Sequence, residues 1–122
     1  MAEKYKGKLI IGLTEELTVI GKNNKRERVT ARIDTGATKS SIDAGQKKEL
    51  QLGPVIKTRM IRSAHGNALR PIVDVDLRMN GKKINAEFTI ADRAHMKYKM
   101  LIGQNILKHG FLIDPQKNGA VL

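Results

Sequence analysis

The chain of 122 residues contains no cysteine and no tryptophan, and aromatic residues make up only 3% of it. The lack of cysteine excludes a disulfide scaffold, a thiolate zinc site and a cysteine nucleophile. The scarcity of aromatic rings leaves no stacking platform of the kind that nucleic-acid-binding modules use, so we do not expect nucleic acid as a partner. The core must instead be built from aliphatic side chains.

Long hydrophobic runs are also absent. The first residues, "MAEKYKGKLIIGL", hold no apolar stretch long enough for a signal peptide or a membrane span. We therefore expect a cytoplasmic protein with no membrane partner. No linker, repeat or low-complexity tract divides the chain, and its length suits one domain, so we expect a single domain over residues 1–122.

Positive charge, in contrast, is abundant. Lys and Arg number 23 against 12 Asp and Glu, which gives a net charge of +11. Such an excess attracts polyanions, and an acidic partner is its simplest explanation. One local concentration of cations comprises Lys22, Lys25, Arg26, Arg28 and Arg32.

The stretch "RPIVDVDLRMNGKKINAEFTIAD", which starts at Arg70, predicts a β-hairpin. Apolar and polar residues alternate on both sides of an Asn-Gly pair, and this pair favours a two-residue turn with positive φ. A strict two-residue loop would oppose like charges, which is mildly unfavourable, so a bulge or a shifted register is an alternative. The opposed pairs would be Asp74 with Glu87 and Arg78 with Lys83.

The remaining pattern predicts an all-β domain that forms a closed barrel with one or two short helices. One short helix is expected to begin after Asp43 and run through Leu50, and another is expected over Gln104–His109. The other predicted strands are Lys6–Leu13, Leu17–Ile20, Val29–Ile33, Val55–Ser63 and Phe111–Ile113.

The stretch "ARIDTGATKSSI", residues 31–42, holds the main candidate for chemistry. Val29, Ala31 and Ile33 alternate as a half-buried strand, so Asp34 lies at the end of that strand. Gly36 permits a tight turn, and Thr35 supplies a short hydroxyl that can lock it. A carboxylate held in this way is rigid, as a catalytic group must be.

Other kinds of site find little support. His65, His95 and His109 share no metal-ligand spacing, so we expect no metal. No serine lies in a glycine elbow, and no glycine-rich phosphate loop is present, so we expect no nucleotide cofactor. A metallopeptidase that uses the histidines stays an alternative hypothesis.

The Asp-Thr-Gly turn together with the later segment "MLIGQNIL" resembles the retropepsin-like aspartic proteases. The resemblance implies a closed barrel of the acid protease fold with Asp34, Thr35 and Gly36 as the catalytic turn. In that superfamily a second segment passes beside the turn and supports it. Here the supporting residues would be Ile102, Gly103 and Gln104.

The resemblance also implies a flap hairpin that closes over the substrate. The segment Lys57–Arg78 is well placed for it, with His65-Gly66-Asn67 near its tip. The implied substrate-binding residues are Ala37, Thr38, Arg62, His65, Gly66, Asn67 and Arg70.

Within that superfamily, the stretches "IDTGATKSSI", "EFTIADRAHMKYKMLIGQNIL" and "FLIDP" resemble a prokaryotic family labelled ATP-dependent zinc proteases. The resemblance covers roughly residues 8–114. These proteins are associated with ATP-grasp ligases that append amino acids to peptides, which implies such a ligase as a functional partner. Neither a zinc constellation nor an ATP loop accompanies the label here, so we expect no cofactor.

One departure from the retroviral pattern concerns an ion pair. Retroviral members have an acidic residue after the turn that pairs with an arginine after the later glycine. The corresponding positions here are Thr38 and Gln104, so a neutral hydrogen bond is expected in place of the ion pair.

An aspartic protease needs two carboxylates that share one proton. The chain has a single Asp-Thr-Gly, so the second aspartate must come from another copy of Asp34 in a homodimer. We expect a homodimeric peptidase that acts on acidic or glutamate-tailed peptides. The rival hypothesis is a non-catalytic basic β-barrel that binds an acidic protein or RNA.

Overall fold

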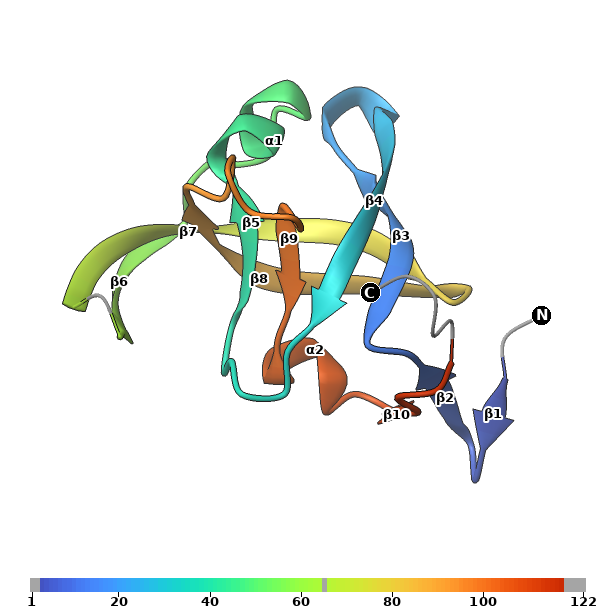
Figure 1. Ribbon diagram of the computed structural model, residues 1–122. Helices are drawn as coiled ribbons and strands as arrows, with labels where there is room; N and C mark the ends of the chain where they lie inside the picture. Colours follow the sequence, from blue (N-terminus) through green and yellow to red (C-terminus); the bar gives the residue numbers. More distant parts are fainter. Residues whose placement is uncertain (1–2, 65, 118–122) are drawn as a thin grey trace.

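The structure of the protein is a computed structural model that describes residues 3–64 and 66–117, and strands dominate it (Figure 1). Within these residues, the helical segments are one 3-10 turn, η1 (Lys22–Asn24), and two short helices, α1 (Ala44–Glu49) and α2 (Gln104–Leu107). The strands are β1 (Lys4–Tyr5), β2 (Lys8–Ile11), β3 (Thr14–Ile20), β4 (Arg26–Ile33), β5 (Ser40–Asp43), β6 (Lys57–Ser63), β7 (Gly66–Met79), β8 (Lys82–Ala91), β9 (Met100–Ile102) and β10 (Phe111–Ile113).

Six of these strands close into a barrel. Their order is β3-β4-β9-β5-β8-β7, and the far end of β7 pairs back with β3 from Thr18 opposite Arg78 to Ile20 opposite Asp76. Among the described strands, β6 pairs with β7 alone, and the hairpin they form projects from one side of the barrel (Figure 1). The prediction of an all-β closed barrel with short helices is confirmed.

The barrel is filled by aliphatic side chains, as the shortage of aromatic residues requires. Val73, Val75, Leu77 and Met79 alternate along β7, and each is fully buried. Phe88 of β8 is the one ring among the largest fully buried side chains of the described residues. Period-two alternation therefore directs one face of each long strand inward.

The β7–β8 hairpin has the strict register that the Asn-Gly pair predicts. Asn80 and Gly81 have φ values of 51° and 79°, and Met79 lies opposite Lys82, so the expectation that a bulge could relieve the like-charge pairs is wrong. Asp74 does lie opposite Glu87. Glu87 forms ion pairs with lysines of other segments instead, which compensates for its acidic neighbour.

Several predicted boundaries shift. The strand predicted over Lys6–Leu13 is shorter than expected and spans Lys8–Ile11 as β2, because Lys6 and Gly7 both have positive φ and form the turn between β1 and β2. Strands β3 and β4 begin earlier than predicted, at Thr14 and Arg26, and β6 begins at Lys57 rather than Val55. Antiparallel pairing of β3 with β4 extends along both strands and explains the added length.

The short elements follow their capping signals. Asp43 precedes α1 and its side chain accepts a hydrogen bond from Gly45 N, as the cap prediction requires. Helix α2 ends at Leu107, two residues before the predicted end, and Gly110 follows with a φ of 96°. The predicted strand Phe111–Ile113 forms β10 and pairs in parallel with β2 in a small second sheet.

Within residues 3–64 and 66–117, no helix has both the length and the apolar character needed to cross a bilayer.

Candidate active site

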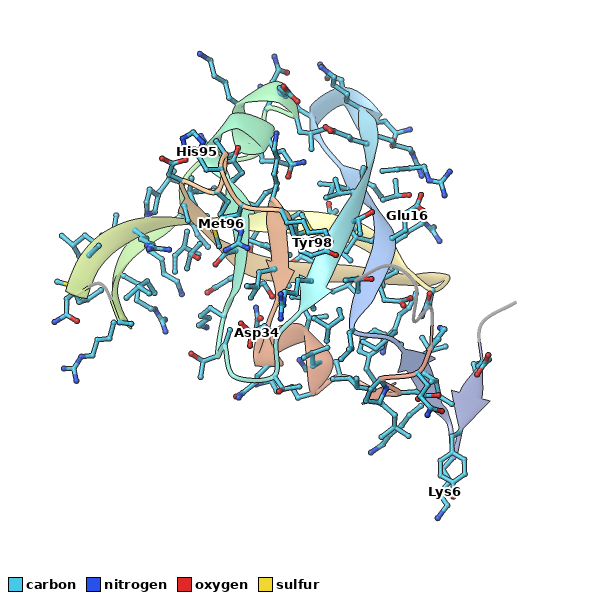
Figure 2. All side chains as sticks on the ribbon, viewed as in Figure 1. Lys6, Glu16, Asp34, His95, Met96 and Tyr98 are labelled. Atoms are coloured by element: carbon cyan, nitrogen blue, oxygen red, sulfur yellow. The ribbon has the colours of Figure 1, made fainter. Side chains whose placement is uncertain are left out.

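Asp34 follows directly on β4, where the barrel strand ends (Figure 2). Its backbone amide donates a hydrogen bond of 2.9 Å to the carbonyl of Ile102 at the end of β9. The Asp34 side chain is half-buried, while Thr35 and Gly36 are exposed. The carboxylate is therefore held at the surface by a strand from the last quarter of the chain.

The turn after Asp34 is closed by the carboxylate itself. Asp34 Oδ1 accepts a hydrogen bond of 2.9 Å from Gly36 N, and Asp34 O accepts one of 3.3 Å from Ala37 N. A side chain at position 36 would place its Cβ 3.3 Å from Asp34 Oδ1, a tight contact. One carboxylate oxygen therefore fixes the turn, which leaves Oδ2 for chemistry.

Gly103 allows the second segment to cross close beneath this turn. A Cβ at position 103 would lie 2.3 Å from Lys39 O and 2.7 Å from Ala37 O, so only glycine fits. Strand β9 lies between β4 and β5, and this places Ile102 beside the turn. Ile102 and Gly103 therefore lie directly beside the Asp34 turn.

Gln104, at the position of the retroviral arginine, forms a neutral hydrogen bond, but with a different acceptor from the one expected. Its side-chain Nε2 donates a hydrogen bond of 2.7 Å to Thr35 O, and its backbone amide donates one of 2.8 Å to Ala37 O. Thr38 is joined to the same helix through its backbone, because Thr38 O accepts from Asn105 N at 3.2 Å. The neutral hydrogen bond exists, but its acceptor is Thr35 rather than the side chain of Thr38.

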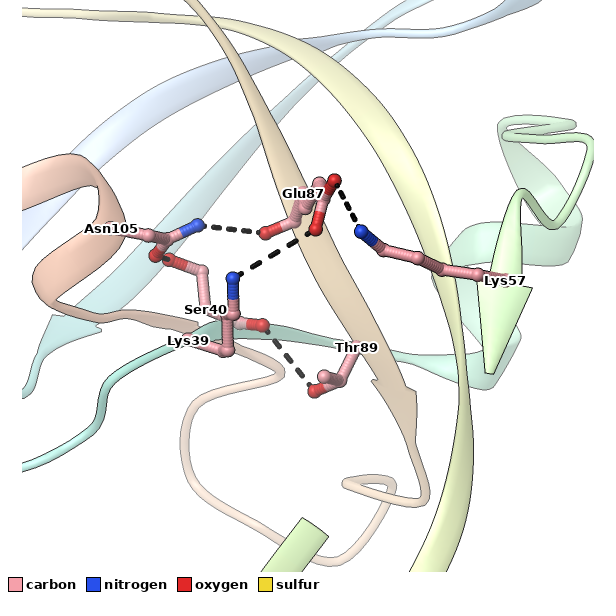
Figure 3. Close-up of polar contacts among 6 residues, drawn as sticks. All are labelled: Lys39, Ser40, Lys57, Glu87, Thr89 and Asn105. Atoms are coloured by element: carbon pink, nitrogen blue, oxygen red, sulfur yellow. Dashed lines mark hydrogen bonds and ion pairs between the residues drawn. The ribbon is translucent and has the colours of Figure 1, made fainter. Parts of the chain in front are cut away.

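A polar network under the turn was not identified in the sequence as part of the site (Figure 3). Ser40 is fully buried; its Oγ accepts from Gly103 N at 2.9 Å and donates to Asn105 Oδ1 at 2.8 Å. Asn105 Nδ2 donates in turn to Glu87 O at 2.9 Å. Ser40 belongs to the short strand β5, which the sequence pattern does not predict, so no local signal indicated this network.

Arg93 is a second residue that sequence reasoning missed. Its Nε donates to Tyr98 O at 3.0 Å, and its backbone amide donates to Asp43 Oδ1 at 2.8 Å. The pKa of Arg93 is lowered, chiefly by burial and then by the charge of Arg70, whereas Asp34 and Asp43 act to raise it. Arg70, Asp34 and Asp43 are thus the charged groups that act on the pKa of this guanidinium.

The segment expected to be the flap is the β6–β7 hairpin, and its closure over a substrate stays a prediction. Arg62 lies opposite Asn67, and Gly66 begins β7 with a φ of 105°. His65, expected near the tip, lies outside the described residues. Met60 and Leu69 form a cross-strand pair and are 52% and 67% exposed, so the hairpin presents apolar surface to its surroundings.

A cavity of about 600 Å³ brings three of the expected site residues together, namely Thr38, Arg62 and Gln104. It lies between strand β6 and the loop that follows the Asp34 turn. Ala37, Gly66, Asn67 and Arg70 do not line it. The complete lining is Thr38, Lys39, Arg59, Met60, Ile61, Arg62, Gln104, Asn105 and Lys108.

His95 and His109, the histidines among the described residues, lie in separate segments of the chain. His95 lies near α1, well apart from Asp34 (Figure 2), and His109 follows α2. In the described ranges, no three His, Cys, Asp or Glu side chains form a group that could hold a metal ion.

A protein-family model matches the chain, and solved structures share its fold, among them the two described next. The model, described as "Retropepsin-like aspartic endopeptidase RimB", matches residues 46–120, which include the flap hairpin and Gly103 but not Asp34. Protein Lpg0085 of Legionella pneumophila, of unknown function (DUF785), has a TM-score of 0.60 at 20% identity over 87% of this chain and 92% of that one. The simian foamy virus (mac) protease has a TM-score of 0.57 at 19% identity over 78% and 91%. At such identities the two structures show the shared fold alone.

A curated relative also matches. A protein of Desulfotalea psychrophila named "Probable alpha-L-glutamate ligase" is 28% identical over 112 residues, which cover 71% of this chain and 24% of the ligase. This chain therefore spans about a quarter of the length of the curated relative it matches.

Proposed function

Because this chain belongs to the RimB-like family of retropepsin-like aspartic endopeptidases, we propose that it hydrolyses peptide bonds and that Asp34 is its catalytic carboxylate. The observation that carries the proposal is the rigid Asp34 turn. Gly36 N donates a hydrogen bond to one carboxylate oxygen of Asp34, and Ile102 O accepts one from the backbone amide of Asp34. A carboxylate fixed by one hydrogen bond, on a backbone fixed by another, keeps the geometry that proton transfer requires.

The chemistry requires a second carboxylate. Two adjacent carboxylates cannot both ionise readily, so they share a proton and titrate as a coupled pair. The ionised partner takes a proton from water as that water attacks the peptide carbonyl, while the protonated partner gives its proton to the carbonyl oxygen. Collapse of the resulting tetrahedral adduct breaks the C–N bond and releases a carboxylic acid and an amine.

We propose that the second carboxylate is Asp34 of a second copy of the chain. No other aspartate in the sequence is followed by Thr-Gly or Ser-Gly. Asp34 is half-buried beside two exposed residues, so a two-fold axis can pass next to it. The homodimer would then be the catalytic unit, with Thr35 and Gly36 of each copy in the shared site.

The proposed substrate is an acidic peptide, such as a glutamate-rich segment or a glutamate tail. The net charge of +11 supports this class of substrate, because it favours encounter with polyanions. The match to a protein named as a glutamate ligase supports a functional link with an ATP-grasp peptide ligase. This link rests on similarity over a quarter of that protein.

The test compares Asp34→Asn with Asp74→Asn, a matched change of an exposed aspartate on β7. Asp34→Asn should abolish hydrolysis of an oligoglutamate peptide while the circular dichroism spectrum and Tm stay close to those of the wild type. Asp74→Asn should keep its activity. Hydrolysis by Asp34→Asn at the wild-type rate would place the chemistry elsewhere.

Mixing the two proteins tests the dimer. An excess of Asp34→Asn added to the wild type should lower activity below that of the wild type alone, because exchange yields dimers with one aspartate. Activity that is indifferent to the added variant, in a protein that sediments as a monomer, would overturn the shared site. Peptide binding by Asp34→Asn without any wild-type hydrolysis would instead favour the non-catalytic binding module.

A further inference from the structure

The cavity beside the Asp34 turn is directly connected to that turn. Gln104, which lines it, donates to Thr35 O, and Asn105, which also lines it, donates to Thr38 O. The opposite wall is strand β6 of the flap hairpin. A peptide that reached Asp34 under the flap would therefore pass this cavity.

The cavity follows the free edge of β6. Four consecutive residues of this strand, 59–62, line it. Successive side chains of a strand point to opposite faces, so a cavity that touches all four must run along the strand edge. The other edge of β6 pairs with β7, and β6 is the last strand in the sheet order. An extended peptide could add to this edge by main-chain hydrogen bonds.

Charge in the cavity is entirely of one sign. Its charged lining residues among those described are Lys39, Arg59, Arg62 and Lys108, and no carboxylate belongs to the lining. These cations come from three segments, namely the loop after the turn, the flap and the end of α2. They therefore surround a volume rather than form a flat stripe, which suits a compact anionic group.

Glu87, just outside the cavity, shows how this environment acts on a carboxylate (Figure 3). It binds Lys57 Nζ at 3.0 Å and Lys39 Nζ at 3.9 Å. The pKa of Glu87 is lowered, mainly by the hydrogen bond from Lys57 and further by the charges of Lys57, Lys39 and Arg59, although burial opposes the shift. The positive potential at this place thus favours an ionised carboxylate.

The β6–β7 hairpin carries a pair of like charges beside the cavity. Arg59 lies directly opposite Arg70 on the neighbouring strand. Like charges in a directly opposed cross-strand pair are destabilising, and an anion bound beside them would relieve the repulsion. The cluster Arg26, Arg28 and Arg32 of β4 does not line this cavity, and Arg28 already pairs with Glu16.

We propose that this cavity is the subsite that selects an acidic side chain of the peptide, with Lys39, Arg59 and Lys108 as the specificity-determining cations. The inference rests on the proposed peptidase function and names the residues that would read the substrate. Glu87 is the positioning residue that holds Lys39 at the mouth of the subsite. An extended peptide on the β6 edge would present every second side chain to these cations.

The experiment measures binding in the Asp34→Asn background, so it does not depend on turnover. The probes are a fluorescein-labelled oligoglutamate and the matched oligoglutamine, followed by anisotropy. Oligoglutamate should bind at least about ten-fold more tightly. Lys39→Gln and Arg59→Gln should each weaken oligoglutamate binding by roughly three- to ten-fold and leave oligoglutamine unchanged.

Two controls separate a subsite from general attraction. Lys48→Gln removes the same charge from the exposed surface of α1, away from the cavity, and should change binding by less than about two-fold. Lys39→Arg should retain binding because it keeps the charge. A loss in Lys48→Gln equal to that in Lys39→Gln, or equal binding of the two peptides, would overturn the subsite.

The remaining outcomes distinguish the two proposals. Binding of oligoglutamate through Lys39 in a protein that never hydrolyses it would keep the subsite and overturn the peptidase. Hydrolysis of both peptides at equal rates and with equal KM would keep the peptidase and overturn the subsite. A single-stranded RNA of equal charge is the last comparison. If it bound more tightly than oligoglutamate and Lys39→Gln weakened that binding, the cavity would be reassigned to nucleic acid.

Discussion

The side-chain amide of Gln104 donates a 2.7 Å hydrogen bond to the backbone carbonyl of Thr35, and the backbone amide of the same residue donates to Ala37. One residue at the start of α2 therefore holds the turn on both sides of Gly36. Because both acceptors are main-chain carbonyls, these bonds fix the path of the backbone itself. An arginine is not needed for this role.

Replacement of Gln104 by Ala tests this clamp. Loss of one exposed hydrogen bond should lower the free energy of unfolding by only about 1 kcal/mol. The kcat for peptide hydrolysis should fall more than this small change in stability implies, because the Asp34 turn loses its orientation. Urea denaturation and steady-state kinetics measure the two effects. Gln116→Ala is the matched exposed control, and an unchanged kcat in Gln104→Ala would show that the turn needs no clamp.

Gly103→Ala should be far more damaging than another glycine substitution. The new Cβ would lie within 2.7 Å of two backbone carbonyl oxygens, which cannot move without breaking the turn. We expect a loss of at least about 3 kcal/mol or failure to fold. Gly7→Ala meets open space at a positive φ of 78° and should lose about 1 kcal/mol. Thermal denaturation compares the two, and equal Tm values would contradict the close crossing.

Ser40→Ala should destabilise the barrel although the change is small. It leaves the buried amide of Gly103 without its acceptor, which costs roughly 1–3 kcal/mol. Ser41→Ala loses a half-buried bond to Thr89 and should lose less. A double-mutant cycle of Ser40→Ala and Asn105→Ala should show non-additivity of about 0.5–3 kcal/mol. Strict additivity would mean that the two side chains act independently.

Glu87→Gln should reduce stability in a pH-dependent way. The folded pKa of Glu87 lies below its ordinary value of 4.5, so its contribution is present in full above that value. It is lost as the pH falls through the lowered folded pKa. The difference between wild type and variant should be at most about 1 kcal/mol at neutral pH, since the ion pairs are partly exposed.

Urea denaturation over a series of pH values measures this difference. The wild type and Glu87→Gln should converge in acid, whereas the exposed control Glu49→Gln should stay close to the wild type throughout. A difference that grew on acidification would contradict the lowered pKa.

The sequence is sufficient to predict features whose causes are local. Asn80 and Gly81 determine the hairpin and its register, because the turn and the alternation on either side agree. Asp43 caps α1 through a bond to a residue only two positions away. The place of Asp34 at the end of a strand follows from the alternation before it.

Features that depend on distant segments are not predictable from the pattern. Strand β5 is short, and three of its four residues are polar; it is a strand because β8 and β9 flank it. Ser40 and Asn105 meet across the fold, and neither has a neighbour in sequence that reveals the other. The influence of Arg70 on Arg93 could not be predicted either, since the two residues come near each other only on folding.

The parallel pairing of β4 with β9 also determines when the site can form during synthesis. Asp34 leaves the ribosome well before Met100–Ile102, the strand that shapes its turn. Domains fold as units once their non-local partners are available, so a growing chain holds the aspartate in an unshaped loop. A chain that stops short of Gly103 therefore holds Asp34 without the support that Gln104 gives to its turn.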